Sequence, residues 1–273
     1  MMTKSKDVLL QVICLVIGFI LLIPIIYAFS ISLMEKKELI MQAGRLFPSK
    51  ITWENYQKVF KMVPIGRYLV NSLFIAMTAS FSRIIVALMS AYAFSFLEFK
   101  WKDEIFTWFV FATLIPTEVM MLPNYRLIAN LGWVNTYIGI LSVSLVSLPN
   151  LILMRQHLKG FPSALKEAAE IDGCNHWQFI RWILLPMSMP IIVTIFMTSF
   201  ISMWNDYMWP LIVTTSEEMR TIQIGVTMIK DRDSINFGPV MAGTIISMVP
   251  SVLIYLVFQR RIIEGMTNGA VKQ

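Results

Sequence analysis

Charged residues are scarce in this chain. Asp, Glu, Lys and Arg make up 15% of its 273 residues, whereas they make up roughly 25% of a soluble globular domain. Cysteine is scarcer still, because the sequence has only Cys14 and Cys174, too few for a disulfide-stabilised secreted scaffold. Glycine and proline, 12 of each, are too few for a collagen-like or low-complexity chain. These shortages exclude an ordinary soluble domain, a disulfide-rich module and a fibrous rod.

Apolar residues are abundant instead, at 56% of the sequence, and the mean hydropathy is +0.65. A bilayer core of about 30 Å is crossed by about 20 helical residues, and six apolar runs approach or exceed that length. The predicted spans are residues 8–34, 68–97, 105–122, 132–154, 182–205 and 234–259. The sequence therefore predicts an all-α integral membrane protein with six transmembrane helices, forming one membrane domain over residues 1–273. An even number of spans places both termini on the same side of the membrane.

The net charge is +6, which by itself could indicate a nucleic-acid partner. Lys and Arg, however, fall in short clusters between the apolar runs and do not form one polar face, so we expect no nucleic-acid partner and assign the excess to membrane flanks. The positive-inside rule does not choose an orientation, because eleven Lys and Arg residues fall on each side of the predicted bundle.

A polar segment at residues 155–181 separates the fourth and fifth predicted spans, and part of it has the pattern of a short helix. Ser163 after Pro162 suits an N-cap, and Gly173 suits a left-handed residue that closes the helix. Helical spacing puts three small or apolar side chains on a common face: Leu165, Ala168 and Ala169. Small side chains on a surface helix favour close approach of another backbone, which is typical of a docking element.

This segment resembles the integral membrane permease subunits of bacterial ATP-binding-cassette importers, whose signature is Glu-Ala-Ala, three residues, Gly, nine residues and Ile-x-Leu-Pro. The matching positions are Glu167, Ala168, Ala169, Gly173, Ile183, Leu185 and Pro186. Other stretches are similar to the carbohydrate-uptake branch, in particular to the second permease of maltose-type and glycerol-3-phosphate-type importers. They are Asn71-Ser72-Leu73, Ala91-Tyr92-Ala93-Phe94, the segment 204–210 and the segment 265–272.

The resemblance implies a complex in the bacterial cytoplasmic (inner) membrane. Its other members would be a second homologous permease, two ATPase subunits and an extracytoplasmic solute-binding protein, with membrane lipid around the spans. The family places the Glu-Ala-Ala loop in the cytoplasm, which implies cytoplasmic termini and a coupling helix that docks on the ATPase. The implied solute is a carbohydrate or a carbohydrate-like molecule: an oligosaccharide, a sugar or a glycerol phosphate.

The chain has no Gly-x-x-x-x-Gly-Lys-Ser/Thr segment to cradle a nucleotide phosphate. We therefore expect it to be no enzyme and to carry no cofactor, with ATP bound and hydrolysed by the partner subunits. No metal site is expected either, because His157, His176 and Cys174 lack a further ligand pair at a suitable spacing.

Polar residues within or beside the spans are candidates for the solute path: Arg83, Glu118, Asn124, Trp204, Asn205 and Asp206. Arg83 is costly in lipid, so it should face a cavity, a partner helix or an acidic residue. An interhelical pair and an electropositive element that favours acidic or phosphorylated solutes are the two alternatives for it. Glu118 and Asn124 follow prolines, where they would either line a cavity or cap a helix.

The Trp204, Asn205 and Asp206 cluster has two alternatives as well. It combines an aromatic platform with hydrogen-bonding groups, as sugar sites do, but tryptophan is also common in the interfacial belt of membrane proteins. Two other function classes compete with the importer: a self-sufficient secondary carrier, which would show an internal repeat or ion-coupling charges in several spans, and a membrane enzyme.

Overall fold

The computed structural model describes residues 2–41, 45–229 and 237–270, and every element in these ranges is a helix. The all-α class is therefore confirmed for the described part of the chain. Two compact units can be distinguished: one consists of residues 1–67 with 224–249, and the other of residues 68–223 with 250–273. The single membrane domain expected from the sequence stays a prediction.

The first unit is organised by a buried amide. Its helices are α1 (Met2–Ser32), α2 (Lys36–Met41) and α3 (Glu54–Met62), together with the start of α15 (Gly238–Ala270). Asn55 on α3 is 2% exposed and donates hydrogen bonds to the carbonyl oxygens of Ser32 (3.0 Å) and Met34 (2.8 Å). Position 238 must be glycine, because a Cβ there would lie 2.6 Å from the Asn55 amide. These contacts fix the short α3 to the end of the long α1.

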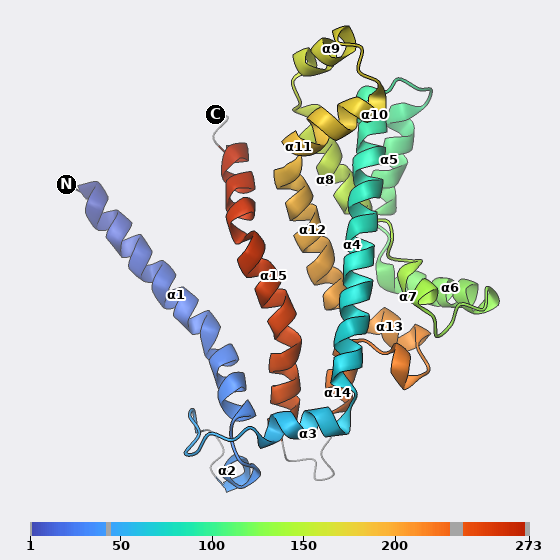
Figure 1. Ribbon diagram of the computed structural model, residues 1–273. Coiled ribbons are helices and arrows are strands. Elements are labelled where there is room, and N and C mark those ends of the chain that lie inside the picture. Colours follow the sequence, from blue (N-terminus) through green and yellow to red (C-terminus); the bar gives the residue numbers. More distant parts are fainter. Residues whose placement is uncertain (1, 42–44, 230–236, 271–273) are drawn as a thin grey trace. The chain divides into compact units, whose positions relative to one another are not determined.

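The second unit contains most of the remaining helices, coloured from cyan to orange in Figure 1. They are α4 (Ile65–Phe96), α5 (Lys102–Ala112), α6 (Thr117–Asn130), α7 (Tyr137–Leu141), α8 (Leu148–Lys159), α9 (Ser163–Ile171), α10 (His176–Phe179), the π-helix η1 (Ile180–Leu184), α11 (Leu185–Met187), α12 (Met189–Trp204), α13 (Met208–Val213) and the 3-10 helix η2 (Glu217–Met219). Most of α14 (Ile222–Met228) belongs to the first unit, which begins its second segment at residue 224.

Three helical stretches are long and apolar enough to cross a membrane: Leu10–Ser32, Ile65–Phe96 and Gly238–Gln259. They correspond to the first, second and sixth predicted spans, although residues 234–236 of the sixth lie outside the described residues. Two bent helix pairs, Lys102–Ala112 with Thr117–Asn130 and His176–Met187 with Met189–Trp204, raise the total to five if each pair is one span. Six spans therefore stay a prediction.

Proline explains why the third, fourth and fifth predicted spans are not straight helices. Pro116 has no N–H to donate and disfavours helical backbone at the residue before it, and α5 and α6 meet there at 97°. Pro149 occupies the first turn of α8, a position that proline tolerates, so residues 132–154 form α7 and α8 with a break between them. The fifth predicted span bends by 77° where α11 ends, just before Pro190.

Candidate functional site

The Glu-Ala-Ala segment forms the surface helix α9, which lies beyond the ends of α4 and α8 (Figure 1). The expectation of Ser163 as N-cap is wrong: Pro162 has the extended backbone of the cap residue, and Ser163 is the first helical residue. At the other end the backbone N–H groups of Gly173 and Cys174 donate to the carbonyls of Glu170 (3.1 Å) and Ala169 (2.9 Å). This is the double hydrogen bond of a Schellman motif, which requires a left-handed residue.

Gly173 provides that left-handed residue. Its φ is +74°, and no atom lies near the position that a Cβ would take. Glycine is therefore required by backbone conformation and not by crowding, because L-residues adopt positive φ at a cost of roughly 1–2 kcal/mol. The sequence-based expectation of a left-handed Gly173 is confirmed.

Only part of the predicted small-residue face of α9 is buried. Ala169 is 4% exposed and packs into an apolar cluster with Tyr92, Leu158 and Phe179, whereas Ala168 and Glu167 are exposed. Ala169 therefore attaches α9 to α4, α8 and α10. The exposed Glu167 and Ala168 leave the outer surface of α9 open to another protein.

The second half of the signature coincides with the π-helix η1. Ile183 packs against the same apolar cluster, while Leu185 and Pro186 follow it and are exposed. Pro186 cannot donate to the carbonyl four residues earlier, and its ring crowds that carbonyl. A π-turn is one way to accommodate such a position, so the Leu-Pro pair marks the place where the helix widens and bends toward α12.

Tyr92 joins this region to the long helix α4. Its hydroxyl lies 2.7 Å from Nδ1 of His176, the first residue of α10. The Tyr92 ring also packs against Phe96 and Phe179, with ring centroids 5.3 and 6.4 Å away. Phe96 lies on α4 itself, so Tyr92 fixes α10 to α4 by one polar contact, with His176, and one aromatic contact, with Phe179.

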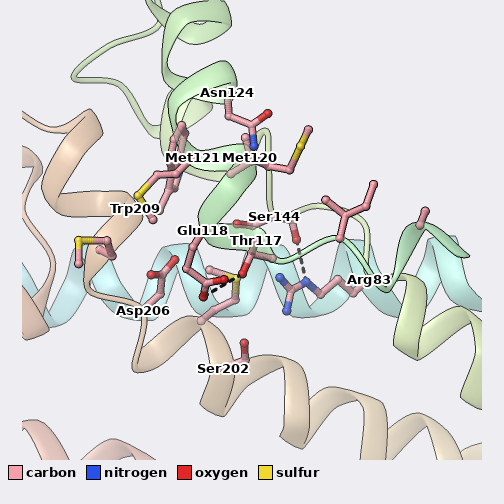
Figure 2. A pocket seen from close by; sticks show the side chains of 15 residues that line it. Arg83, Thr117, Glu118, Met120, Met121, Asn124, Ser144, Ser202, Asp206 and Trp209 are labelled. Carbon is pink, nitrogen blue, oxygen red and sulfur yellow. Dashed lines mark hydrogen bonds between the residues drawn. The ribbon is translucent and has the colours of Figure 1, made fainter. Parts of the chain in front are cut away.

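A cavity of about 620 Å³ lies within the second unit, between α4, the α5–α6 bend, the α7–α8 break and α12–α13. The structure brings four of the six candidate path residues to its wall: Arg83, Glu118, Asn124 and Asp206. Figure 2 shows the side chains of Arg83, Glu118 and Asp206 gathered in this cavity. The helix breaks at the prolines create the space, because backbone that leaves the helix axis stops filling the bundle.

Arg83 is tethered at one edge of its guanidinium. Its Nε donates to the carbonyl oxygen of Ser144 in the α7–α8 break, at 2.7 Å. The charge of Asp206 acts on the Arg83 guanidinium across the cavity. Arg83 thus faces a cavity and an acidic residue, two of the environments that its cost in lipid led us to expect.

Trp204 and Asn205 are not among the residues of the cavity wall. Trp204 is 1% exposed and stacks on Phe200, with centroids 5.6 Å apart and planes at 15°. The Asn205 side chain accepts a hydrogen bond from Gln223 Nε2 at 3.3 Å. A core position therefore explains Trp204 better than a sugar platform does.

Trp209, which the sequence reasoning missed, provides the aromatic surface of the cavity. Its Nε1 donates to the carbonyl oxygens of Gly139 (3.3 Å) and Ile140 (3.1 Å) on α7, which fixes the orientation of the indole ring. It belongs to the same conspicuous segment 204–210 as Trp204. Periodicity alone does not decide which of two tryptophans faces a cavity when the helix ends between them.

Sequence comparison identifies the family. Residues 4–267 match the family described as "Binding-protein-dependent transport system inner membrane component". The chain belongs to this family. The permease is 35% identical over 265 residues to the sn-glycerol-3-phosphate transport system permease protein UgpE of Brucella suis, covering 93% of this chain and 94% of that one.

Another relative is the arabinooligosaccharides transport system permease protein AraQ of Halalkalibacterium halodurans, 29% identical with 94% of this chain and 93% of that one covered. Among solved structures, the permease matches a bacterial ABC transporter involved in the import of the acidic polysaccharide alginate, with a TM-score of 0.84, 23% identity, and 94% and 96% of the two chains covered. That likeness shows the fold. The family predicted from the Glu-Ala-Ala signature is confirmed, and with it an inner membrane component of an ABC transport system.

Proposed function

We propose that this permease is one of the two translocation subunits of an ATP-driven importer for a carbohydrate or carbohydrate-like solute. The observation that carries the proposal is the joint presence of the family match over residues 4–267 and a polar cavity between broken helices. Relatives named for sn-glycerol-3-phosphate and arabinooligosaccharides support the solute class. The solute is an oligosaccharide, a sugar or a glycerol phosphate.

The translocation path forms with a second homologous permease, and an extracytoplasmic binding protein delivers the solute. The proposed topology has six spans and cytoplasmic termini: the three long helices and the two bent pairs give five, and the segment 132–154, which forms α7 and α8, would be the sixth. Arg83, Glu118, Asn124 and Asp206 contribute to the path. No metal or cofactor is required in this chain, because partner ATPase subunits bind and hydrolyse the ATP.

Helix α9 couples the permease to an ATPase subunit. Its exposed Glu167 and Ala168 make the contact, and the buried Ala169 transmits the displacement to α4 and α8. The angle at which α9 joins the bundle is set by Gly173 and by the segment that contains Ile183, Leu185 and Pro186. A rigid element fixed at both ends converts ATPase closure into movement of packed helices, as alternating access requires.

The test is ATP-driven uptake by the complete complex in liposomes, measured together with ATP hydrolysis. Gly173→Ala and Glu167→Gln are expected to lose most of the uptake per ATP hydrolysed while the complex still assembles. Gly160→Ala is the matched control for glycine, because its φ is not positive and the new Cβ meets only the carbonyl oxygen of His157, at 3.5 Å. Glu98→Gln, an exposed carboxylate outside α9, is the control for charge.

Normal uptake per ATP hydrolysed in both Gly173→Ala and Glu167→Gln would refute the coupling role. A self-sufficient secondary carrier predicts a different result: uptake that persists without the ATPase subunits and ATP and follows an ion gradient. Assaying the permease pair alone in liposomes with an imposed proton or sodium gradient separates the two functions.

A further inference from the structure

The wall of the cavity in the second unit carries opposing charges in unequal number. Arg83 contributes one positive charge, and Glu118 and Asp206 contribute two negative charges. The other polar groups on the wall are neutral: Thr117, Asn124, Ser144 and Ser202. The formal charge of the wall is therefore one positive minus two negative, or −1. Arg83 and Asp206 are half-buried whereas Glu118 is exposed, so water screens the charge of the wall only in part.

The wall offers hydrogen-bond donors as well as acceptors. The Nε of Arg83 already donates to the carbonyl oxygen of Ser144, so its two terminal nitrogens are left to donate to a solute. A carboxylate accepts hydrogen bonds and donates none. Asp206 accepts from the backbone N–H of Trp209, and Glu118 accepts from the hydroxyl of Thr117 at 3.3 Å; each carboxylate has further lone pairs. With the terminal nitrogens of Arg83 and the amide of Asn124 as donors, the wall suits a solute whose groups both donate and accept hydrogen bonds.

A sugar hydroxyl donates one hydrogen bond and accepts others, so it can satisfy the carboxylates and the guanidinium together. A phosphate or carboxylate group supplies acceptors almost exclusively and is repelled by Glu118 and Asp206. Trp209, whose indole is fixed by two carbonyl oxygens, lines the cavity but is 6% exposed, so it offers a sugar ring only a small apolar surface. The volume of about 620 Å³ lies in the range of small-molecule sites.

We infer that this cavity is a subsite for an uncharged, hydroxyl-rich solute and that its carboxylates discriminate against phosphorylated and acidic solutes. The inference rests on the proposed function and sharpens it. It separates this permease from the relatives named for sn-glycerol-3-phosphate and from the structural neighbour involved in alginate import. Arg83 then serves to orient hydroxyl groups beside two carboxylates, and it does not attract an anion.

The electrostatic part can be measured without knowing the natural solute. Ser202 lines the cavity and becomes the reporter as Ser202→Cys, in a chain whose own thiols are removed by Cys14→Ser and Cys174→Ser. The complete complex in detergent is treated with methanethiosulfonate reagents that carry a trimethylammonium, a neutral methyl or a sulfonate group. Each rate is divided by the rate of the same reagent with a free thiol, so that intrinsic reactivity cancels.

The cationic reagent is expected to react about tenfold faster than the anionic one after this normalisation. Neutralising the wall with Glu118→Gln and Asp206→Asn in the same chain should abolish or reverse the preference. Glu217→Gln, a carboxylate of the same unit outside the cavity, should leave it unchanged. Equal rates, a faster anionic reagent, or a thiol that no reagent reaches would overturn the inference.

Protection of the same thiol tests the solute class. Maltotriose as a neutral probe should slow the reaction with the neutral reagent, and sn-glycerol 3-phosphate at the same concentration should not. Protection by the phosphate alone, or by neither probe, contradicts the assignment. The labelling requires no ATP hydrolysis, so its failure leaves the coupling experiments with Gly173 standing, and failure of those experiments leaves the labelling result standing.

Discussion

The hydroxyl of Tyr137 donates a 2.7 Å hydrogen bond to Oδ1 of Asn71, a residue of α4 that is completely buried. The amide nitrogen of Asn71 donates in turn to the carbonyl oxygens of Glu218 (2.7 Å) and Arg220 (2.8 Å). One side chain thus fixes α7 and the loop around η2 to α4. Buried polar groups are costly when unpartnered, so this residue controls how precisely that loop is placed.

Asn71→Ala is expected to lower the free energy of unfolding by about 2–4 kcal/mol, because it leaves two carbonyl oxygens and one hydroxyl without their partner. Tyr137→Phe removes one of the three bonds and keeps the edge contact with Phe74, 5.0 Å between centroids; it should cost about 1 kcal/mol. Thermal unfolding of the complex in detergent measures both. Equal losses for the two variants would show that the carbonyl contacts contribute nothing.

A second buried pair joins two helices of the bundle. Nδ2 of Asn150 on α8 donates to Oγ of Ser199 on α12 at 2.8 Å, and both residues are buried. Hydrogen bonds between membrane helices average about 0.6 kcal/mol in double-mutant cycles. The cycle of Asn150→Ala, Ser199→Ala and the double variant should give a coupling energy of about that size. A coupling energy of zero would mean that the pair is formed without stabilising the packing of α8 on α12.

The sequence predicted the all-α class, the long spans and four of the fifteen residues of the cavity wall. Apolar run length predicted α1, α4 and α15, although the run that forms α4 carries the charge of Arg83. The Schellman glycine was predictable too, since Gly173 follows a helical pattern and few other residues tolerate positive φ. Both features are local in the chain.

The bends and the cavity depend on long-range packing. Pro116 was visible in the sequence, but a proline by itself does not specify the 97° angle at which α5 and α6 meet. Trp204 and Trp209 are equally conspicuous in sequence, yet one stacks on Phe200 and the other lines the cavity. Which of them is exposed to the cavity depends on where α12 ends and α13 begins, and composition does not contain that information.

Arg155 on α8 offers a comparison between two sources of stability. Its guanidinium lies 3.7 Å from the ring centroid of Phe106 and 3.2 Å from Asp103 Oδ1. The Arg155 side chain is 8% exposed, but that of Asp103 is 84% exposed, so water weakens the ion pair. The stacking contact should therefore dominate, and it needs the planar guanidinium.

Arg155→Lys is expected to cost about 1–2 kcal/mol through loss of stacking, and Asp103→Asn less than about 1 kcal/mol. Thermal unfolding at low and high salt distinguishes the contribution of the ion pair from that of the stacking contact, because salt screens only the ion pair. If Asp103→Asn proves the more damaging variant, the ion pair and not the ring holds α5 on α8.

His157 should make the stability of the permease depend on pH. It lies in the polar segment after the predicted fourth span, its Nε2 is buried without a hydrogen-bond partner among the described residues, and burial lowers the pKa of its imidazole below the ordinary 6.5. The folded state therefore binds fewer protons than the unfolded state between the lowered pKa and 6.5. The contribution of His157 to stability is fully present above pH 6.5 and falls as the pH drops through that window.

His157→Leu should remove this slope, whereas His176→Gln, which changes the exposed histidine bonded to Tyr92, should keep it. Unfolding temperatures of the three complexes between pH 7.5 and 5 provide the measurement, and an unchanged slope in His157→Leu would assign the pH dependence to another group.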